Sequence, residues 1–193
     1  MTVQLNKRTK RVVIHEGHFI RFVKEGQWEY VERSNCDGIV IILALTNQGK
    51  VLFVEQYRPP VKHKVIELPA GLINDDHPRR KDQRFRKRKE SIIAAAQREL
   101  LEETGYKATR IVKLLEGPVS SGFCSDMVTV VRAQGVEKVS SGGGDELESI
   151  VVHEVPLTKT DAWLKKMEKK GFMIEPKVYT GLYFLRYPQA RKK

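Results

Sequence analysis

Three acidic residues on one face of a predicted helix constrain this chain more than any other sequence feature. Glu99, Glu102 and Glu103 stand at i, i+3 and i+4, so a helix would place their carboxylates within an arc of roughly 100°. The apolar residues of the same stretch would point to the other side and face the core: Ile93, Leu100 and Leu101. The spacing therefore predicts an amphipathic helix whose acidic face lines a cleft.

Two interpretations of this acidic face are open. The face could be solvated, on a surface helix that ends at Gly105 as a glycine cap. It could instead bind a hard divalent cation, because carboxylate oxygens are the ligands that suit Mg²⁺ and Mn²⁺. A bound cation would also turn the repulsion between like charges at this spacing into attraction.

The residues around the three carboxylates favour the metal site. Glu90 is followed by seven residues, Arg98-Glu99-Leu100, one residue, Glu102-Glu103, one further residue and Gly105-Tyr106. This order resembles the Nudix box apart from its first glycine, and six fixed residue types in register arise by chance about once in 10⁵ chains or fewer. The resemblance implies an α/β fold, the Nudix α/β/α sandwich, in which this helix carries the metal site.

The stretch before the helix departs from the box, because the family glycine usually lies six positions before the glutamate that Glu90 matches. The candidate here is Gly71, 19 positions before Glu90, and residues 75–89 form an insert between the two. The entropic cost of closing a loop grows only with the logarithm of its length. The helix can therefore survive the insert, although the approach to the site can change.

The insert is basic and carries much of the chain's net charge of +11, with eight Arg or Lys residues against three Asp residues. It could be a basic loop without a partner, an arm that binds RNA, or a surface that steers an anionic substrate. Phe85 is the single aromatic residue of the insert, which argues against a base-stacking platform. Nucleic acid is therefore a possible partner but not the favoured one.

Length and composition place the chain among ordinary globular proteins. A chain of 193 residues with 40% hydrophobic content can bury one sizeable core. The sequence has no run of 18 or more apolar residues, so we expect no membrane span. Its N-terminus lacks the apolar centre of a signal peptide. Cys36 and Cys124 have no metal-ligand spacing, so we expect free, buried thiols in a cytoplasmic protein.

Hydrophobic patterns alternate between strand and helix along the chain. Strands are predicted over 11–14, 18–24, 27–33, 39–45, 51–57, 65–68, 108–115, 127–133 and 150–155. Helices are predicted over the acidic stretch, 158–170 and 176–185. The run from 39 to 45 is apolar throughout, which predicts a strand buried on both faces. This mixture of elements predicts a mixed α/β sandwich.

Two further motifs narrow the resemblance to one branch of the Nudix hydrolases. Glu55-Gln56-Tyr57-Arg58-Pro59-Pro60 and Glu67-Leu68-Pro69-Ala70-Gly71-Leu72 are similar to motifs of the ADP-ribose pyrophosphatases, also called ADP-sugar pyrophosphatases. Trp28-Glu29 and Arg33 upstream, and the loop 144–148 downstream, extend this similarity. One departure is Ser121, before Gly122, where this branch usually has proline. That departure leaves the choice among nucleoside diphosphate sugars open.

The resemblance implies a role for each residue of the box. Glu99, Glu102 and Glu103 would hold Mg²⁺, or Mn²⁺ in its place, helped by the main-chain carbonyl of Ala70. Arg98 would fix one of these carboxylates by a bidentate pair. Nine residues turn an ideal helix by about 900°, so Glu90 would lie opposite Glu99 and act as a supporting residue.

In this branch the general base comes from a loop and not from the helix. The glycine run before residue 145 predicts such a loop, so Glu146 is the candidate base. Glu148 is the alternative base or an extra metal contact. The other interpretation is that both residues merely keep a surface loop soluble.

The substrate would contact residues outside the box. The resemblance implies that Trp28 stacks on the nucleobase, that Arg33 and Arg58 contact phosphate, and that Glu29 and Gly122 also line the substrate site. Trp28 could instead make a cross-strand contact with Phe22 or Tyr30.

Relatives in this branch are two-fold dimers, and the resemblance therefore also implies a homodimer. It divides the chain into an N-terminal β-hairpin extension over 1–37, used for dimerisation and substrate contact, and a Nudix hydrolase domain over 38–193 that contains the insert. Trp28 and Arg33 would then act on the partner's site.

The predicted function is Mg²⁺-dependent hydrolysis of the diphosphate bond of a nucleoside diphosphate sugar. ADP-ribose, giving AMP and ribose 5-phosphate, is the first candidate, and GDP-mannose or another such sugar is the alternative. A protein that binds RNA or processes RNA caps would use the basic insert. A nucleotide sensor without catalysis is disfavoured, because every carboxylate of the box is present.

Overall fold

The computed structural model describes residues 9–34, 36–74, 89–144 and 149–187. Two of the predicted site residues, Glu146 and Glu148, lie outside the described residues, as does the insert except Lys89. The strands are β1 (Arg11–Glu16), β2 (Ile20–Glu25), β3 (Trp28–Arg33), β4 (Gly38–Thr46), β5 (Lys50–Arg58), β6 (His63–Glu67), β7 (Ala70–Ile73), β8 (Tyr106–Pro118), β9 (Met127–Lys138), β10 (Val151–Pro156) and β11 (Met173–Ile174). The helices are α1 (Ile92–Thr104), α2 (Thr160–Lys169), which follows a 3₁₀ turn, and α3 (Pro176–Arg186).

Among the described residues, eight strands form one mixed sheet, in the order β11-β6-β5-β4-β9-β8, with β10 paired to β5 and β7 paired to β4. The pairs β4–β9 and β11–β6 are parallel, and the other pairs are antiparallel. Strands β4 and β5 are registered at Leu45 and Val51. The sheet therefore has two halves that meet at the turn between β4 and β5. One half is built around β4 and β9, and the other around β5 and β6.

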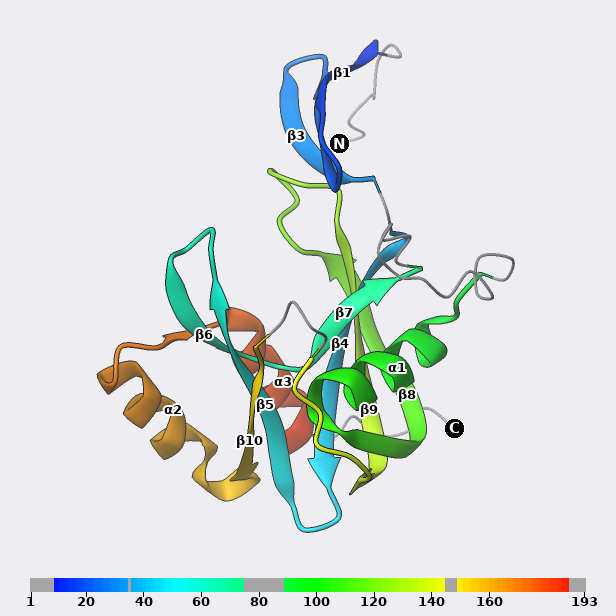
Figure 1. Ribbon diagram of the computed structural model, residues 1–193. Coiled ribbons are helices and arrows are strands. Elements are labelled where there is room, and N and C mark those ends of the chain that lie inside the picture. The colour runs from blue at the N-terminus through cyan, green and yellow to red at the C-terminus, as the bar shows by residue number, and fades with distance from the viewer. Residues whose placement is uncertain (1–8, 35, 75–88, 145–148, 188–193) are drawn as a thin grey trace.

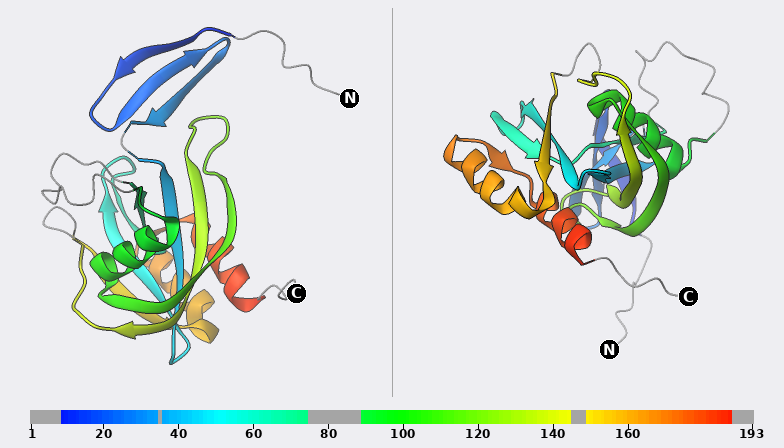
Figure 2. Two further views of the ribbon diagram at one scale, coloured as in Figure 1. Left: turned by 90° about the vertical axis from the view of Figure 1, so that its right-hand side faces the viewer. Right: turned by 90° about the horizontal axis from the view of Figure 1, so that it is seen from below.

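Helices cover both faces of the sheet, as Figure 1 and the view from below in Figure 2 show. Val40 and Ile42 of β4 pack with Ala95, Ala96 and Leu100 of α1 in one buried cluster. Side chains of a strand alternate between faces, so the intervening residues of β4 pack on the opposite side with α2 and α3: Ile41 and Leu43. The prediction of a strand buried on both faces, in a mixed α/β sandwich, is therefore confirmed.

The N-terminal strands form a separate antiparallel sheet, in the order β1-β2-β3, that stands at one end of the larger sheet (Figure 2, left). Its edge strand β3 is bonded to the loop between β8 and β9. The Val31 N–H donates to the Phe123 carbonyl at 3.0 Å, and the Ser125 N–H donates to the Val31 carbonyl at 3.1 Å. Main-chain bonds therefore join the extension to the body of the protein.

Several details differ from the sequence prediction. Strand β8 is longer than predicted, beginning at Tyr106 and ending at Pro118, and the short strands β7 and β11 were not predicted. Cys36 and Cys124 are half-buried and not buried, and no disulfide joins them. Among the residues described, no helix is long and apolar enough to cross a membrane.

Candidate active site

Helix α1 has a well-defined cap at each end. The Ser91 hydroxyl accepts a hydrogen bond from the Ala94 N–H at 3.2 Å, as an N-cap residue does. Gly105 ends the helix in the left-handed region at a φ of 76°, and its N–H donates to the Leu101 carbonyl. Because Ser91 is the N-cap, Glu90 lies before the helix, and the prediction of its position from helical rotation is wrong.

The buried face of α1 also differs from the prediction. Ile93 is 55% exposed, whereas Glu99 is 8% exposed and Glu103 is 5% exposed. The small side chains of Ala95 and Ala96 let α1 lie close to the sheet, and this orientation turns Ile93 outward. Two residues of the acidic face, Glu99 and Glu103, are therefore enclosed between α1 and β7, whereas Glu102 is exposed.

Strand β7 supplies the wall against which these carboxylates pack. The Ala70 N–H donates to Glu103 Oε2 at 3.0 Å. A Cβ atom placed on Gly71 would lie 1.9 Å from the Glu99 carboxyl carbon, so Glu99 occupies the space that a side chain at position 71 would need. The sequence marked Gly71 only as the displaced glycine of the box, and the structure gives it this packing role.

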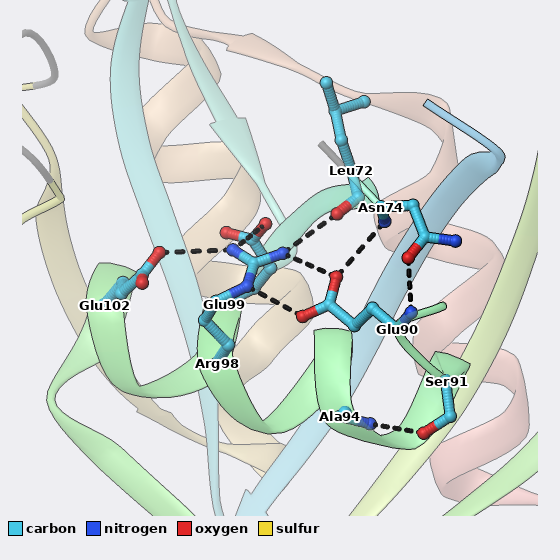
Figure 3. A network of polar contacts seen from close by, with 8 residues as sticks. All are labelled: Leu72, Asn74, Glu90, Ser91, Ala94, Arg98, Glu99 and Glu102. Atoms are coloured by element: carbon cyan, nitrogen blue, oxygen red, sulfur yellow. Dashed lines mark hydrogen bonds and ion pairs between the residues drawn. The ribbon is translucent and has the colours of Figure 1, made fainter. Parts of the chain in front are cut away.

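Arg98 organises the carboxylates from one side, as Figure 3 shows. Its Nη1 donates to Glu99 at 2.6 Å and to Glu102 at 3.2 Å, and its Nε donates to Glu90 at 3.0 Å. Its Nη2 donates to the Leu72 carbonyl at 3.0 Å. Burial favours the neutral form of this guanidinium, but the hydrogen bond to Glu90 and the charge of Glu99 outweigh burial and raise the pKa of Arg98.

A reciprocal pair of hydrogen bonds closes the base of the insert. The Asn74 N–H donates to Glu90 Oε2 at 3.1 Å, and the Glu90 N–H donates to the Asn74 side-chain oxygen. Asn74 has a φ of 55°, a left-handed conformation that asparagine tolerates better than most residues. Glu90 is thereby held where it can bind Arg98, so it supports the site through contacts that helical geometry did not predict.

Arg58, at the end of β5, forms an ion pair with Glu67 at the end of β6. Arg58 Nη2 and Glu67 Oε2 are 2.8 Å apart, and Arg58 Nε donates to the same carboxylate at 2.9 Å. Burial raises the pKa of Glu67, although the Arg58 guanidinium opposes that change. Glu67 was quoted only as part of a motif, and the structure identifies it as the residue that orients Arg58.

The other predicted substrate residues lie in or beside the three-stranded sheet, apart from α1 (Figure 1). Trp28 is 64% exposed and faces Glu25 in the strand register, so neither Phe22 nor Tyr30 is its cross-strand partner. Glu29 forms an ion pair with Lys24 at 3.2 Å. Arg33 Nε donates to Asp126 at 3.0 Å, and Gly122 lies exposed in the neighbouring loop.

A cavity of about 480 Å³ lies between the N-terminal end of α1 and the neighbouring strands β4, β7, β8 and β9. Its lining includes Asp37, Ile73, Glu90, Ser91, Glu116 and Met127. Its volume is within the range of small-molecule sites. The cavity therefore joins the first turn of α1 to the strand ends near Asp126, which binds Arg33.

The acidic face fits a divalent metal in the chemistry of its donors. Glu99, Glu102 and Glu103 offer hard carboxylate oxygens beside the main chain of Ala70, which is the donor type that Mg²⁺ prefers. Within the described ranges, no three acidic, His or Cys side chains converge into a ready metal site in this conformation. Arg98 Nη1 donates to both Glu99 and Glu102, so one guanidinium nitrogen links these two carboxylates.

Comparison with known proteins identifies the family. The family profile of the NUDIX domain matches residues 37–171. The chain is 33% identical over 154 residues to an ADP-ribose pyrophosphatase of Bacillus subtilis (strain 168), which covers 79% of this chain and 74% of the relative. It is 30% identical over 169 residues to a methanol dehydrogenase activator of Bacillus methanolicus, covering 86% of this chain and 82% of the relative.

Two further matches agree with this assignment. A GDP-mannose pyrophosphatase of Yersinia pestis (strain Pestoides F) is 29% identical over 161 residues, covering 79% of this chain and 71% of the relative. A crystal structure of an ADP compounds hydrolase superposes with a TM-score of 0.65 at 18% identity, covering 93% of this chain and 91% of that one, and confirms the fold. The chain therefore belongs to the Nudix family, and the prediction of a Nudix pyrophosphohydrolase is confirmed.

Proposed function

We propose that the chain hydrolyses the diphosphate bond of a nucleoside diphosphate sugar, with ADP-ribose as the main substrate and AMP and ribose 5-phosphate as the products. The observation that carries this proposal is the set of three carboxylates on α1. Glu99 and Glu103 pack against β7, and Arg98 binds Glu99 and Glu102. Relatives with two different nucleoside diphosphate sugars in their names support the substrate class.

The chemistry assigns separate tasks to the residues of the site. Glu99, Glu102, Glu103 and the Ala70 carbonyl hold Mg²⁺, with Mn²⁺ as a substitute. When bound, the metal neutralises the diphosphate charge and makes a bound water more acidic. Arg98 keeps Glu99 in place during the reaction.

Hydrolysis adds water at one phosphorus atom and breaks that atom's bond to the bridging oxygen. Glu146 accepts the proton of the attacking water, and Glu148 is the alternative base. The bridging oxygen leaves with the other phosphate, so the two monophosphate products together contain the added water.

Substrate binding uses both sheets. Arg58, oriented by Glu67, contacts the diphosphate, and the cavity beside Glu90 receives part of the substrate. Trp28, Glu29, Arg33 and Gly122 lie apart from α1 in one chain, which supports a homodimer in which the extension completes the partner's site. We place this enzyme in the cytoplasm, where its two thiols would stay reduced.

GDP-mannose is the second candidate substrate. Ser121 replaces the proline that the ADP-ribose branch usually has at this position, and it lies in the loop that contacts β3. A relative that carries GDP-mannose in its name matches nearly as well as the ADP-ribose relative. The difference between the two substrates is in the base and sugar, and the metal site would serve both.

The test is a substrate panel with purified protein and Mg²⁺. The panel contains ADP-ribose, GDP-mannose, ADP-glucose, NADH, a diadenosine polyphosphate and capped RNA, and Glu102→Gln is the inactive control. We expect the highest kcat/KM for ADP-ribose, with AMP and ribose 5-phosphate detected by chromatography. Faster cleavage of GDP-mannose would change the substrate assignment, and no cleavage of any member would overturn the hydrolase proposal.

Two matched variants distinguish the candidate bases. Glu146→Gln should lower kcat by about 10²- to 10⁴-fold, which is the usual contribution of a general base, whereas Glu148→Gln should have a smaller effect. A stronger loss in Glu148→Gln would exchange the two roles.

RNA that binds with steep salt dependence, and only when residues 75–89 are present, would favour the nucleic-acid alternative.

A further inference from the structure

The C-terminal end of α1 is held by a segment that follows β9, residues 139–144, which we call the glycine clamp. Figure 1 shows this yellow segment passing beside the end of α1 on its way toward β10. The N–H groups of Val139 and Ser140 donate to the Gly105 carbonyl at 2.8 Å and 3.0 Å. The clamp therefore begins on the residue that caps the helix.

Two further bonds of the clamp reach the main chain of proposed metal-binding residues. The Gly143 N–H donates to the Glu103 carbonyl at 2.9 Å, and the Gly144 N–H donates to the Glu102 carbonyl at 3.1 Å. The last carbonyls of a helix have no partner within the helix, so their partners must come from elsewhere. The clamp supplies these partners at the two positions whose side chains form the acidic face.

The close approach of the clamp to α1 requires glycine at position 142. Gly142 has a φ of 66°, and a Cβ atom there would lie 2.3 Å from the Thr104 carbonyl carbon and 2.5 Å from the Gly105 nitrogen. The opposing glycine is equally crowded, because a Cβ atom on Gly105 would lie 2.2 Å from the Ser140 carbonyl oxygen. Main chain packs directly on main chain here, and no flexible side chain can move aside.

We propose that Gly142 is a positioning residue for the metal site. By letting the clamp dock on α1, it fixes the last turn of the helix and so sets the direction in which the Glu102 and Glu103 carboxylates point. This inference rests on the proposed metal-binding role of those two residues. It predicts that the docking of the clamp and the binding of a divalent cation strengthen each other, as linked equilibria must.

The first test compares Gly142→Ala with Gly49→Ala, measuring the binding of Mn²⁺ by electron paramagnetic resonance. Gly49 has a similar φ of 72° in the turn between β4 and β5, but a Cβ atom there would meet nothing within 4 Å. Both variants carry the strain of a positive φ, and only Gly142→Ala displaces the clamp. We expect Mn²⁺ to bind at least about tenfold more weakly to Gly142→Ala, as when a residue that supports a metal ligand is lost, and to bind Gly49→Ala like wild type.

The second test uses the unaltered protein and decides the question even if Gly142→Ala does not fold. Hydrogen exchange of single amides is measured by nuclear magnetic resonance with and without Mg²⁺. Gly143 and Gly144 should be protected, and saturating Mg²⁺ should slow their exchange further. The Gly171 amide, which donates to the Glu168 carbonyl at 2.9 Å after α2, is the internal control and should not respond to Mg²⁺.

The outcomes separate this inference from the proposed function. Wild-type protein that binds no Mn²⁺ would overturn the proposed function, and this inference with it. If Gly142→Ala binds Mn²⁺ as tightly as the wild type does, the inference alone is overturned. It is also overturned if Mg²⁺ does not change the exchange rates of the Gly143 and Gly144 amides in the wild-type protein.

Discussion

Gly71 and Glu99 share one small volume between β7 and α1. The carboxyl carbon of Glu99 lies 1.9 Å from the position that a Cβ atom of residue 71 would take. The same carboxylate is bound by Arg98 at 2.6 Å and is 8% exposed. A buried carboxylate cannot move to a new position without losing its hydrogen bonds, which is costly.

Gly71→Ala should therefore disable the site while leaving the strand intact. The backbone at Gly71 does not have a positive φ, so alanine causes no backbone strain and acts only by displacing Glu99. We expect Mg²⁺ affinity and kcat each to fall by about 10- to 100-fold, measured by calorimetry and by steady-state cleavage of the best substrate.

Gly117→Ala is the matched control for that substitution. Gly117 also lies in a strand, and a Cβ atom there would meet nothing within 4 Å. Its activity should equal that of the wild type. An active Gly71→Ala enzyme with normal Mg²⁺ affinity would show that Glu99 does not need its present position.

At the residue scale, spacing predicted which side chains share the acidic face but not how that face is oriented. Ile93 is exposed and Glu99 and Glu103 are buried, because Ala95 and Ala96 decide how α1 sits on the sheet. Arg98 donates a hydrogen bond to Glu90. Ideal helix geometry could not predict this bond, because the helix begins after its N-cap Ser91 and Glu90 lies outside it. Asn74 gave no sequence signal, because its partner lies on the other side of the insert.

At the scale of elements, Tyr106 at the start of β8 is joined to Glu154 of β10. The Tyr106 hydroxyl donates to Glu154 at 2.6 Å, and Lys50 forms an ion pair with the same carboxylate at 3.0 Å. The Tyr106 hydrogen bond and then the Lys50 hydrogen bond lower the pKa of Glu154 below its ordinary value of 4.5. Burial and Glu154 in turn raise the pKa of Tyr106 to about 12.

This pair should make the stability of the fold depend on acidity. A carboxylate with a lowered pKa in the folded state stabilises that state above its ordinary pKa, and the stabilisation is lost as the pH falls through the folded value. The free energy of unfolding should therefore fall as the pH drops below about 4.5, and Glu154→Gln should reduce that fall.

Urea unfolding at a series of pH values measures this effect. Tyr106→Phe removes the largest cause of the lowered pKa and should reduce the acid-dependent fall in the same pH range. Equal slopes for the wild type and Glu154→Gln would contradict the prediction.

Long apolar runs in the sequence predicted the main elements, whereas the short strands were not predicted. The run from 39 to 45 predicted β4 because its residues are buried by packing on both sides. Strands β7 and β11 have four and two residues, and each exists because a partner far along the chain, β4 or β6, pairs with it. Such pairing leaves no local periodicity to detect.

At the scale of the whole molecule, the proposed dimer predicts that each substrate site combines Trp28 of one chain with α1 of the other. Trp28→Ala should be weakly active alone, and Glu102→Gln should be inactive alone. If Trp28 acts on the partner's site, mixed dimers contain one complete site, and random mixing should restore about a quarter of the wild-type sites.

The experiment is to denature the two variants together, refold them and measure cleavage of the best substrate. Each variant refolded alone is the control. Activity that stays at the level of the controls, in a sample shown by sedimentation to contain dimers, would place Trp28 and α1 of the same chain in one site.

The reciprocal hydrogen bonds between Asn74 and Glu90 make the geometry of the site independent of the length of the chain that joins these two residues. Whatever peptide runs between them starts and finishes at two points that already hold each other, so its closure costs little more as it lengthens. In evolutionary terms, this boundary permits insertion and loss without a matching change in α1. For protein engineering, it marks a place where a foreign peptide can be grafted next to an active site without redesigning it.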